Sequence, residues 1–137
     1  MILIIRVGAF VARYSCAMVE EYHFGSITIN GKTYNHDVEV RWGGEVLKWR
    51  RNESHLFNID SVKRAVEQNP DTIILGTGES GVAKVTEDCQ KFIEEKGVEL
   101  IIDKTGEAVR TFNIICEKSL EEEEKQRKVI GLFHLTC

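Results

Sequence analysis

A glycine-rich segment that follows the apolar run Thr72–Leu75 is the part of the sequence whose residue types and spacing suggest specific chemistry. Residues Gly76 to Gly81 form the pattern G-x-G-x-x-G, and Asp103 ends the next apolar run. In dinucleotide-binding folds this pattern turns directly into a helix whose amides bind the pyrophosphate, and an acidic residue about 20 positions later binds the ribose. The segment therefore raises the hypothesis that the protein binds NAD.

The spacing after the last glycine argues against that hypothesis. Thr86 is the first residue that can cap the following helix, and the residues from Val82 to Val85 separate it from Gly81. The glycine segment is then a wide loop rather than a tight turn from strand to helix. We therefore predict no dinucleotide and no other cofactor, and the loop instead marks the edge of a candidate cleft.

Several polar residues are expected to gather around this loop. In βαβ units the loops after successive parallel strands meet at one edge of the sheet, so the glycine loop and the segment after Asp103 should be neighbours. The candidate ligand-binding cleft comprises Gly76, Thr77, Gly78, Glu79, Asp103, Thr105, Arg110 and Asn113. Loop amides and a helix start would suit a small anion. The alternative is structural: Thr105 caps a helix, Arg110 pairs with a surface acid, and the glycines form a turn.

The histidines and cysteines form no recognisable catalytic or metal-binding pattern. The histidines are scattered, and the cysteines lack the C-x-x-C pairs and the ligand spacing of zinc sites. They are His23, His36, His55 and His134, and Cys16, Cys89, Cys116 and Cys137. We therefore predict no catalytic residue and no metal ligand, and we expect the cysteines to be reduced.

Alternating apolar residues indicate β-strands in the first half of the chain. Asn30-Gly31 lies between two such runs and predicts a hairpin, because both residues tolerate the positive φ of a type I′ turn. Gly43-Gly44 offers a second turn before the apolar residues that begin at Val46. The first half is therefore expected to be a β meander.

A helical period replaces this alternation in the second half. We predict that Asp60 caps the first helix, that Thr86 caps the second, which ends before Gly97, and that Thr105 begins the third. Predicted strands cover residues 72–75, 98–102 and 129–135. Strands that alternate with helices imply βαβ crossovers and a largely parallel central sheet. The sequence therefore predicts an α/β fold with an added β layer.

The chain is expected to contain one globular domain, residues 18–137, after an N-terminal extension, residues 1–17. A length of 137 residues with 42% hydrophobic content is enough for one core without disulfide support. Arg6 and Arg13 interrupt the apolar extension, so we predict no membrane span. We interpret the extension as lying upstream of a natural start at Met18; an organelle import leader and a secretory signal are the alternatives.

Tryptophans and basic residues between Arg41 and Arg51 could stack on a nucleic acid strand and neutralise it. The net charge of −4 disfavours this interpretation, and packing of Trp42 and Trp49 on the meander explains the same pattern. Nucleic acid is therefore not a predicted partner.

Several motifs resemble those of a small family of largely uncharacterised domains. They are Trp42-Gly43-Gly44, Trp49, His55, Gly76-Thr77-Gly78, Thr105-x-x-Ala108-Val109-x-x-Phe112-Asn113 and Val129-x-Gly131-x-Phe133-His134-x-Thr136-Cys137. The family includes archaeal structural-genomics targets, the adipogenesis-associated domain-containing protein and a mitochondrial complex I assembly factor. The resemblance implies a three-layer fold, with a mixed central sheet between helices on one side and β and α elements on the other. It implies no established reaction or cofactor.

We therefore predict a non-catalytic protein-interaction or assembly module of unknown function. The alternative is a domain that binds a small ligand, or acts as an enzyme, at a cleft beside Gly76 to Gly78. A protein partner is expected, with self-association into a homo-oligomer as one form of it. A cytoplasmic location is expected, or a mitochondrial one if residues 1–17 act as an import leader.

Overall fold

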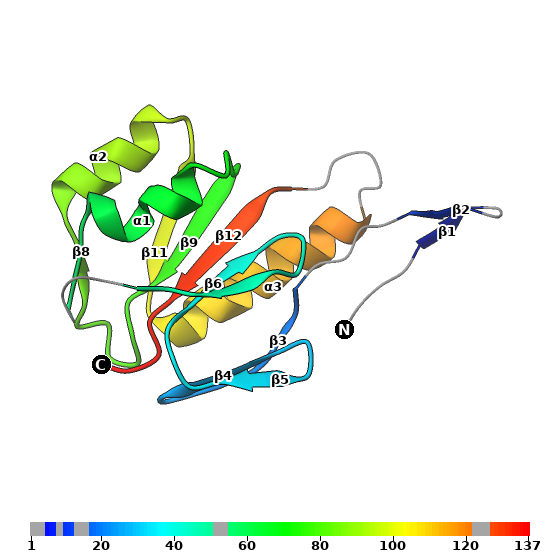
Figure 1. Ribbon diagram of the computed structural model, residues 1–137, viewed down its shortest axis with the longest axis horizontal. Helices are drawn as coiled ribbons and strands as arrows, with labels where there is room; N and C mark the ends of the chain where they lie inside the picture. Colours follow the sequence, from blue (N-terminus) through cyan, green and yellow to red (C-terminus); the bar gives the residue numbers. More distant parts are fainter. Residues whose placement is uncertain (1–4, 8–9, 13–16, 51–54, 122–126) are drawn as a thin grey trace.

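A five-stranded mixed sheet forms the centre of the fold. The computed structural model describes residues 5–7, 10–12, 17–50, 55–121 and 127–137 (Figure 1). The sheet has the order β11, β9, β12, β6, β7, with β6 at Val38–Arg41, β7 at Val46–Lys48, β9 at Thr72–Gly76, β11 at Glu99–Asp103 and β12 at Val129–Phe133. β9 is parallel to both β11 and β12, whereas β6 is antiparallel to both β12 and β7. All residues of β9 and β12 are buried, which accounts for their continuous apolar sequences.

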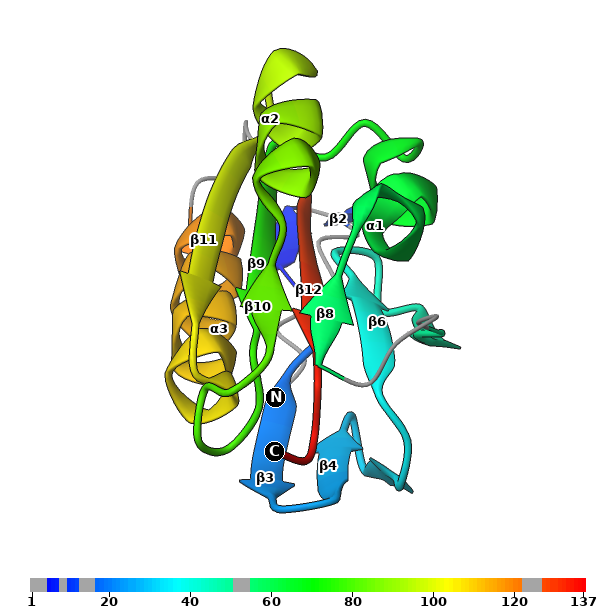
Figure 2. The same ribbon diagram turned by 90° about the vertical axis from the view of Figure 1, so that its left-hand side faces the viewer.

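Different layers cover the two faces of this sheet. α1 (Ile59–Val66) and α2 (Glu87–Glu95) pack on one face, and α3 (Thr105–Glu121) packs on the other (Figures 1 and 2). A small antiparallel sheet of β3 (Val19–His23), β4 (Ser26–Ile29) and β5 (Lys32–Tyr34) lies on the α3 side. Successive residues of β9 point to opposite faces of the sheet. Ile73 and Leu75 belong to the core under α1 and α2, and Ile74 belongs to the core under α3. The predicted three-layer α/β fold with a mixed sheet is confirmed.

Three of the four helix ends predicted from local sequence signals are correct: Thr86 and Gly97 bound α2, and Thr105 begins α3. Thr86 caps α2 by accepting a hydrogen bond from the N–H of Cys89 at 3.1 Å, and Gly97 follows the helix with a φ of +76°. The prediction that Asp60 caps α1 is wrong, because Asn58 is the cap. The side chains of Asn58 and Ser61 each accept a hydrogen bond from the other residue's backbone N–H, which places Asp60 inside the first turn.

The predicted β meander is divided between two sheets. Asn30 and Gly31, with φ values of +50° and +82°, form the β4–β5 turn as predicted. After Tyr34 the chain leaves the small sheet and enters the central one, where β6 and β7 form a second hairpin. The alternating pattern therefore predicted the strands and their turns but not their assignment to sheets.

Two pairs of short strands complete the described structure. β8 (Leu56–Phe57) and β10 (Lys84–Val85) are parallel and lie side by side in Figure 2. β10 ends the segment that was expected to be a loop before Thr86. β1 (Ile5–Val7) and β2 (Phe10–Ala12) form an antiparallel pair within the N-terminal extension. No helix in the described ranges is long and apolar enough to cross a membrane.

The described cysteines differ in chemical state. Cys89 and Cys137 are free thiols, whereas Cys116 is disulfide-bonded, so the expectation that the cysteines are all reduced is wrong. Cys89 is fully buried on the inner face of α2, and this burial raises the pKa of its thiol to about 11. Its thiol therefore serves as an apolar core group.

Candidate functional site

The glycine loop after β9 packs tightly against the rest of the protein. The register of the parallel strands places Asp103 and Phe133 on either side of Gly76, so the carboxyl ends of three strands meet at this edge. A Cβ atom at Gly76 would lie 2.7 Å from Thr105 Oγ1. At Gly78 a Cβ would overlap the carbonyl oxygen of Thr136, and the φ of +104° favours glycine as well. Glycine is thus required at positions 76 and 78 by close packing rather than by a phosphate-binding turn.

Thr105 joins the loop to two other segments. Its buried hydroxyl accepts a hydrogen bond from Gly78 N–H at 2.8 Å and donates one to the carbonyl of His134 at 2.6 Å. Its own N–H donates to Gly78 O at 3.0 Å. The hydroxyl is therefore committed to holding the loop and the segment after β12 together, and it differs from the simple helix cap considered as the structural alternative.

The segment after β12 fills one side of the loop. Glu79 N–H donates to Thr136 O at 2.9 Å, and Leu135 N–H donates to Asp37 Oδ1 at 2.8 Å. The two ring nitrogens of buried His134 lie 2.8 Å from Asp37 Oδ2 and 2.7 Å from Cys137 O. Because both neighbours accept, a doubly protonated ring can donate both bonds and a neutral ring only one. These contacts anchor residues 134–137 where a ligand would otherwise approach Gly78.

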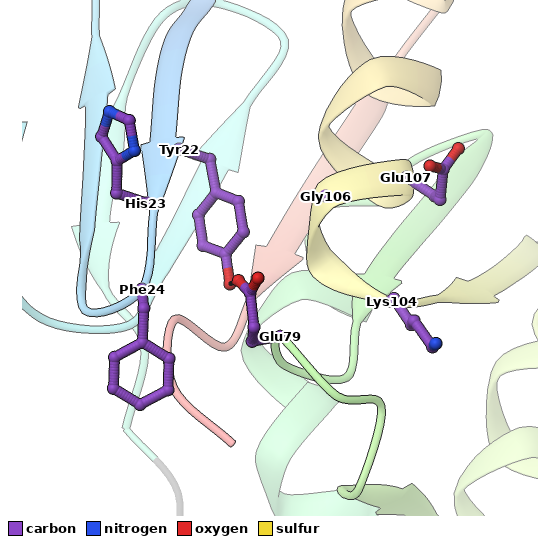
Figure 3. A pocket seen from close by; sticks show the side chains of 7 residues that line it. All are labelled: Tyr22, His23, Phe24, Glu79, Lys104, Gly106 and Glu107. Atoms are coloured by element: carbon purple, nitrogen blue, oxygen red, sulfur yellow. Dashed lines mark hydrogen bonds between the residues drawn. The ribbon is translucent and has the colours of Figure 1, made fainter.

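A first cleft, here the Phe24 cleft, lies between the β3–β4 turn and the start of α3 (Figure 3). It has a volume of about 330 Å³ and is lined by Tyr22, His23, Phe24, Glu79, Lys104, Gly106 and Glu107. The Tyr22 hydroxyl donates a hydrogen bond to Glu79 Oε2 at 2.9 Å across the cleft. Burial raises the pKa of Tyr22 above its ordinary value, and the Glu79 carboxylate raises it further.

Phe24 is exposed on a turn that is itself fixed. Its side chain is 58% exposed, and it follows the end of β3 at the rim of the cleft. The next residue, Gly25, has a φ of +83° and donates its N–H to Leu135 O at 2.9 Å. The aromatic ring is therefore presented to solvent by a turn that is hydrogen-bonded to the segment after β12.

A second cleft, here the Lys84 cleft, lies on the other side of the glycine loop. Its volume is about 420 Å³, and it is lined by Thr77, Gly81, Ala83, Lys84, Val85, Gln90, Ile102, Asp103 and Lys104. Thr77 donates both its N–H and its hydroxyl to Asp103 O, at 2.9 and 3.1 Å. The expected proximity of the two loops is thus confirmed, and Lys104 lines both clefts.

The residues predicted for one cleft are distributed among four environments. Glu79 lines the Phe24 cleft, Thr77 and Asp103 line the Lys84 cleft, and Gly76, Gly78 and Thr105 are buried between them. The remaining two residues lie on α3 outside both clefts.

Those two α3 residues have other contacts. Arg110 is exposed and forms an ion pair with Glu107 at 3.2 Å. Asn113 is hydrogen-bonded through both atoms of its amide to the backbone of Val19. The surface ion pair matches the structural alternative for Arg110, and Asn113 connects α3 to β3.

Most residues of the Phe24 cleft were not predicted from the sequence, and Glu79 is the exception. Tyr22, His23 and Phe24 precede a glycine with positive φ, which is a signal for a turn but not for its neighbours. Lys104 could have been included because it follows Asp103 directly. In the described ranges, no group of three or more His, Cys, Asp and Glu side chains is placed to hold a metal ion.

The fold defines a class of small three-layer α/β domains with a mixed central sheet. Residues 19–134 match the family described as protein of unknown function (DUF498/DUF598), and the chain belongs to this family.

Solved structures show the same fold. Conserved hypothetical protein PH1505 from Pyrococcus horikoshii OT3 is 24% identical, with a TM-score of 0.70, over 87% of this chain and 98% of that one. MT938 is 25% identical, with a TM-score of 0.68, over 88% of this chain and 99% of that one. A Mth938-like domain from Bordetella pertussis is 15% identical, with a TM-score of 0.62, over 96% of this chain and 92% of that one. These similarities establish the three-layer fold without assigning an activity.

Proposed function

We propose that this protein is a non-catalytic protein-interaction or assembly module that binds its partner through Phe24 and the cleft beside it. The observation that carries the proposal is the 58% exposure of Phe24 on a turn fixed by the Gly25–Leu135 hydrogen bond. Exposed aromatic residues often supply much of the binding energy of an interface. A turn that is already ordered loses little conformational entropy when a partner binds.

The chemistry of the Phe24 cleft supports the same proposal. Its wall combines the aromatic rings of Tyr22 and Phe24 with the charged side chains of Glu79, Lys104 and Glu107. In Figure 3, Glu79 points toward the Tyr22 hydroxyl, whereas Phe24 and Lys104 extend away from that pair. An apolar anchor with charged groups around it is the usual composition of an interface with a polar rim.

The buried polar groups also favour a non-catalytic role. In the described part of the chain, every buried side-chain nitrogen or oxygen atom has a hydrogen-bond partner. Thr105 and His134 in particular are engaged within the fold. These groups stabilise the domain in the observed arrangement, which leaves recognition to the exposed side chains.

The family resemblance gives the proposal a biological direction. The motifs that resemble a mitochondrial complex I assembly factor and the adipogenesis-associated domain-containing protein favour a role in bringing other proteins together. The proposed location is the cytoplasm, or mitochondria if residues 1–17 act as an import leader. A homo-oligomer is one form that such an interaction can take.

Affinity capture with a matched pair of variants tests the proposal. F24A truncates the aromatic anchor, and I114A truncates a side chain of similar exposure, 52%, on α3. Partners captured by the wild type and by I114A should be lost with F24A, and a purified partner should bind F24A about tenfold more weakly. Equal capture by F24A and I114A would show that Phe24 is not the recognition residue.

Small-ligand binding beside the glycine loop is the second candidate function. The observation that favours it is the Lys84 cleft, which contains the predicted residues Thr77 and Asp103. Ligand binding at the Lys84 cleft can be measured independently of Phe24, since of these two clefts Phe24 lines only the other one.

A further inference from the structure

We propose that the Lys84 cleft binds a small organic phosphate, with the phosphate between Lys84 and Lys104 and a short apolar group on Ile102 and Val85. The cleft opens between the glycine loop, β10, α2 and the end of β11, and its volume of about 420 Å³ accommodates a small metabolite. The proposal rests on the second candidate function, small-ligand binding at this cleft, and the lining shares only Lys104 with the Phe24 cleft.

The charges lining the cleft favour an anion. Lys84 and Lys104 are exposed, and within the described residues neither forms an ion pair. Asp103 is the single carboxylate in the lining, and its Oδ1 accepts the N–H of Lys104 at 2.9 Å. In Figure 3 the Lys104 side chain extends away from Tyr22 and Glu79. Positive charge therefore exceeds negative charge at this one cleft, although the whole chain has a net charge of −4.

The backbone of the loop is compatible with a phosphate. Gly81 lines the cleft with a φ of +69°, and its N–H has no hydrogen-bond partner among the described residues. A Cβ atom at this position would lie 3.1 Å from Lys104 Cγ. Glycine thus lets the Lys104 side chain run across the loop, so that an ammonium group and a free amide are available at the same place. Lysine ammonium groups and free amides are common phosphate ligands in proteins.

The other wall of the cleft is apolar. Ile102 is 39% exposed on the edge strand β11, and Ala83 and Val85, the sequence neighbours of Lys84, belong to the same lining. An inorganic ion would leave this apolar surface in water, whereas an alkyl or similar group attached to the phosphate would cover it. The combination therefore favours a phosphate ester over phosphate itself.

The probe for the test is n-propyl phosphate, added to isotope-labelled full-length protein and followed by NMR. Saturable shifts are expected at the amides of Gly81, Lys84 and Lys104. K84Q and K104Q should each weaken binding about tenfold, because a charge-assisted hydrogen bond contributes roughly that factor. K118Q removes an exposed lysine of α3 and should bind as the wild type does, as should F24A.

Three further comparisons test separately the effect of Asp103, of the propyl group and of the phosphate group. D103N removes the lining carboxylate and should strengthen binding by roughly a factor of two, through loss of a like charge. Inorganic phosphate should bind more weakly than n-propyl phosphate, and n-propanol should not bind. Absence of saturable shifts, equal loss in K118Q, or equal affinity for inorganic phosphate would overturn the inference. If F24A loses the partner but keeps the probe, and K84Q loses the probe but keeps the partner, the two proposals stand independently, because Phe24 and Lys84 each line one of these two clefts only.

Discussion

Asn113 on α3 and Val19 on β3 are joined by two hydrogen bonds that use both atoms of the asparagine amide. Asn113 Oδ1 accepts from Val19 N–H at 3.0 Å, and Asn113 Nδ2 donates to Val19 O at 2.8 Å. The side chain thus pairs with the strand as a neighbouring backbone would. It fastens the small sheet, which supplies Tyr22 and the turn that carries Phe24, to the main body of the domain.

Replacing Asn113 should therefore loosen the small sheet. N113A leaves the N–H and carbonyl of Val19 without these partners, and we expect a loss of about 2 kcal/mol in the free energy of unfolding. T111A on the same helix is the control and should change it by less than about 0.5 kcal/mol. Urea denaturation measures both values, and equal stabilities of the two variants would contradict the assigned role of the amide.

Thr105 should stabilise the protein mainly through its hydroxyl. T105V preserves the shape but leaves Gly78 N–H and His134 O unpaired in a buried position, so a loss of about 3 kcal/mol is expected. T105S keeps the hydroxyl and removes one methyl group, which should cost about 1 kcal/mol. Thermal or urea unfolding compares the two variants, and a smaller loss in T105V than in T105S would refute this explanation.

Two glycines with positive φ should respond differently to alanine. G97A adds a Cβ with nothing within 4 Å, so only the backbone conformation is penalised, by about 1 kcal/mol. G78A adds the same penalty and also an overlap with Thr136 O, so its loss should reach about 3 kcal/mol. Both variants are measured by equilibrium unfolding. If they lose the same stability, residues 134–137 do not pack against the loop as described.

Tyr22 should make the protein sensitive to alkaline pH. Its pKa is raised in the folded state, mainly by burial and then by Glu79, so the folded protein retains a proton that the unfolded chain loses above about pH 10. The corresponding stabilisation is complete below that pH and is lost as the pH rises toward the folded-state pKa. Y22F should therefore show a shallower alkaline loss of stability than the wild type.

Y34F is the control for this pH dependence, because it removes one hydroxyl from the same small sheet. The free energy of unfolding is measured across the alkaline range for the three proteins, and Y34F should keep the wild-type slope. Identical slopes for Y22F and the wild type would show that Tyr22 does not produce the effect.

The sequence predicted those features that depend on neighbouring residues. Asn30-Gly31, Thr86 and Gly97 act through their own backbone or the next turn, and each lies where the local rule placed it. The predicted cap of α1 was wrong because Asn58 and Asp60, two residue types that can cap a helix, lie two positions apart. Asn58 prevails because Ser61 can return a hydrogen bond to it, and Asp60 has no such partner three residues later.

Features that depend on distant contacts could not be predicted in the same way. The Phe24 cleft exists because the β3–β4 turn meets Glu79 and the start of α3, which are far away in the chain. Likewise, nothing in the glycine motif indicates that Thr136 closes one side of it. The motif correctly predicted that this loop lies at the edge of the sheet. Tertiary packing decides which side of the loop is open to solvent.

The position of β12 in the central sheet also constrains how the protein is made. Within that sheet β12 is the strand that connects the β9–β11 pair to the β6–β7 pair, although its residues, Val129–Phe133, come last in the order of strands. The two pairs can therefore join into one sheet only after this segment has been synthesised. Until then the edges of β6 and β9 that pair with β12 lack this partner, and unpaired strand edges make partly folded chains prone to aggregation.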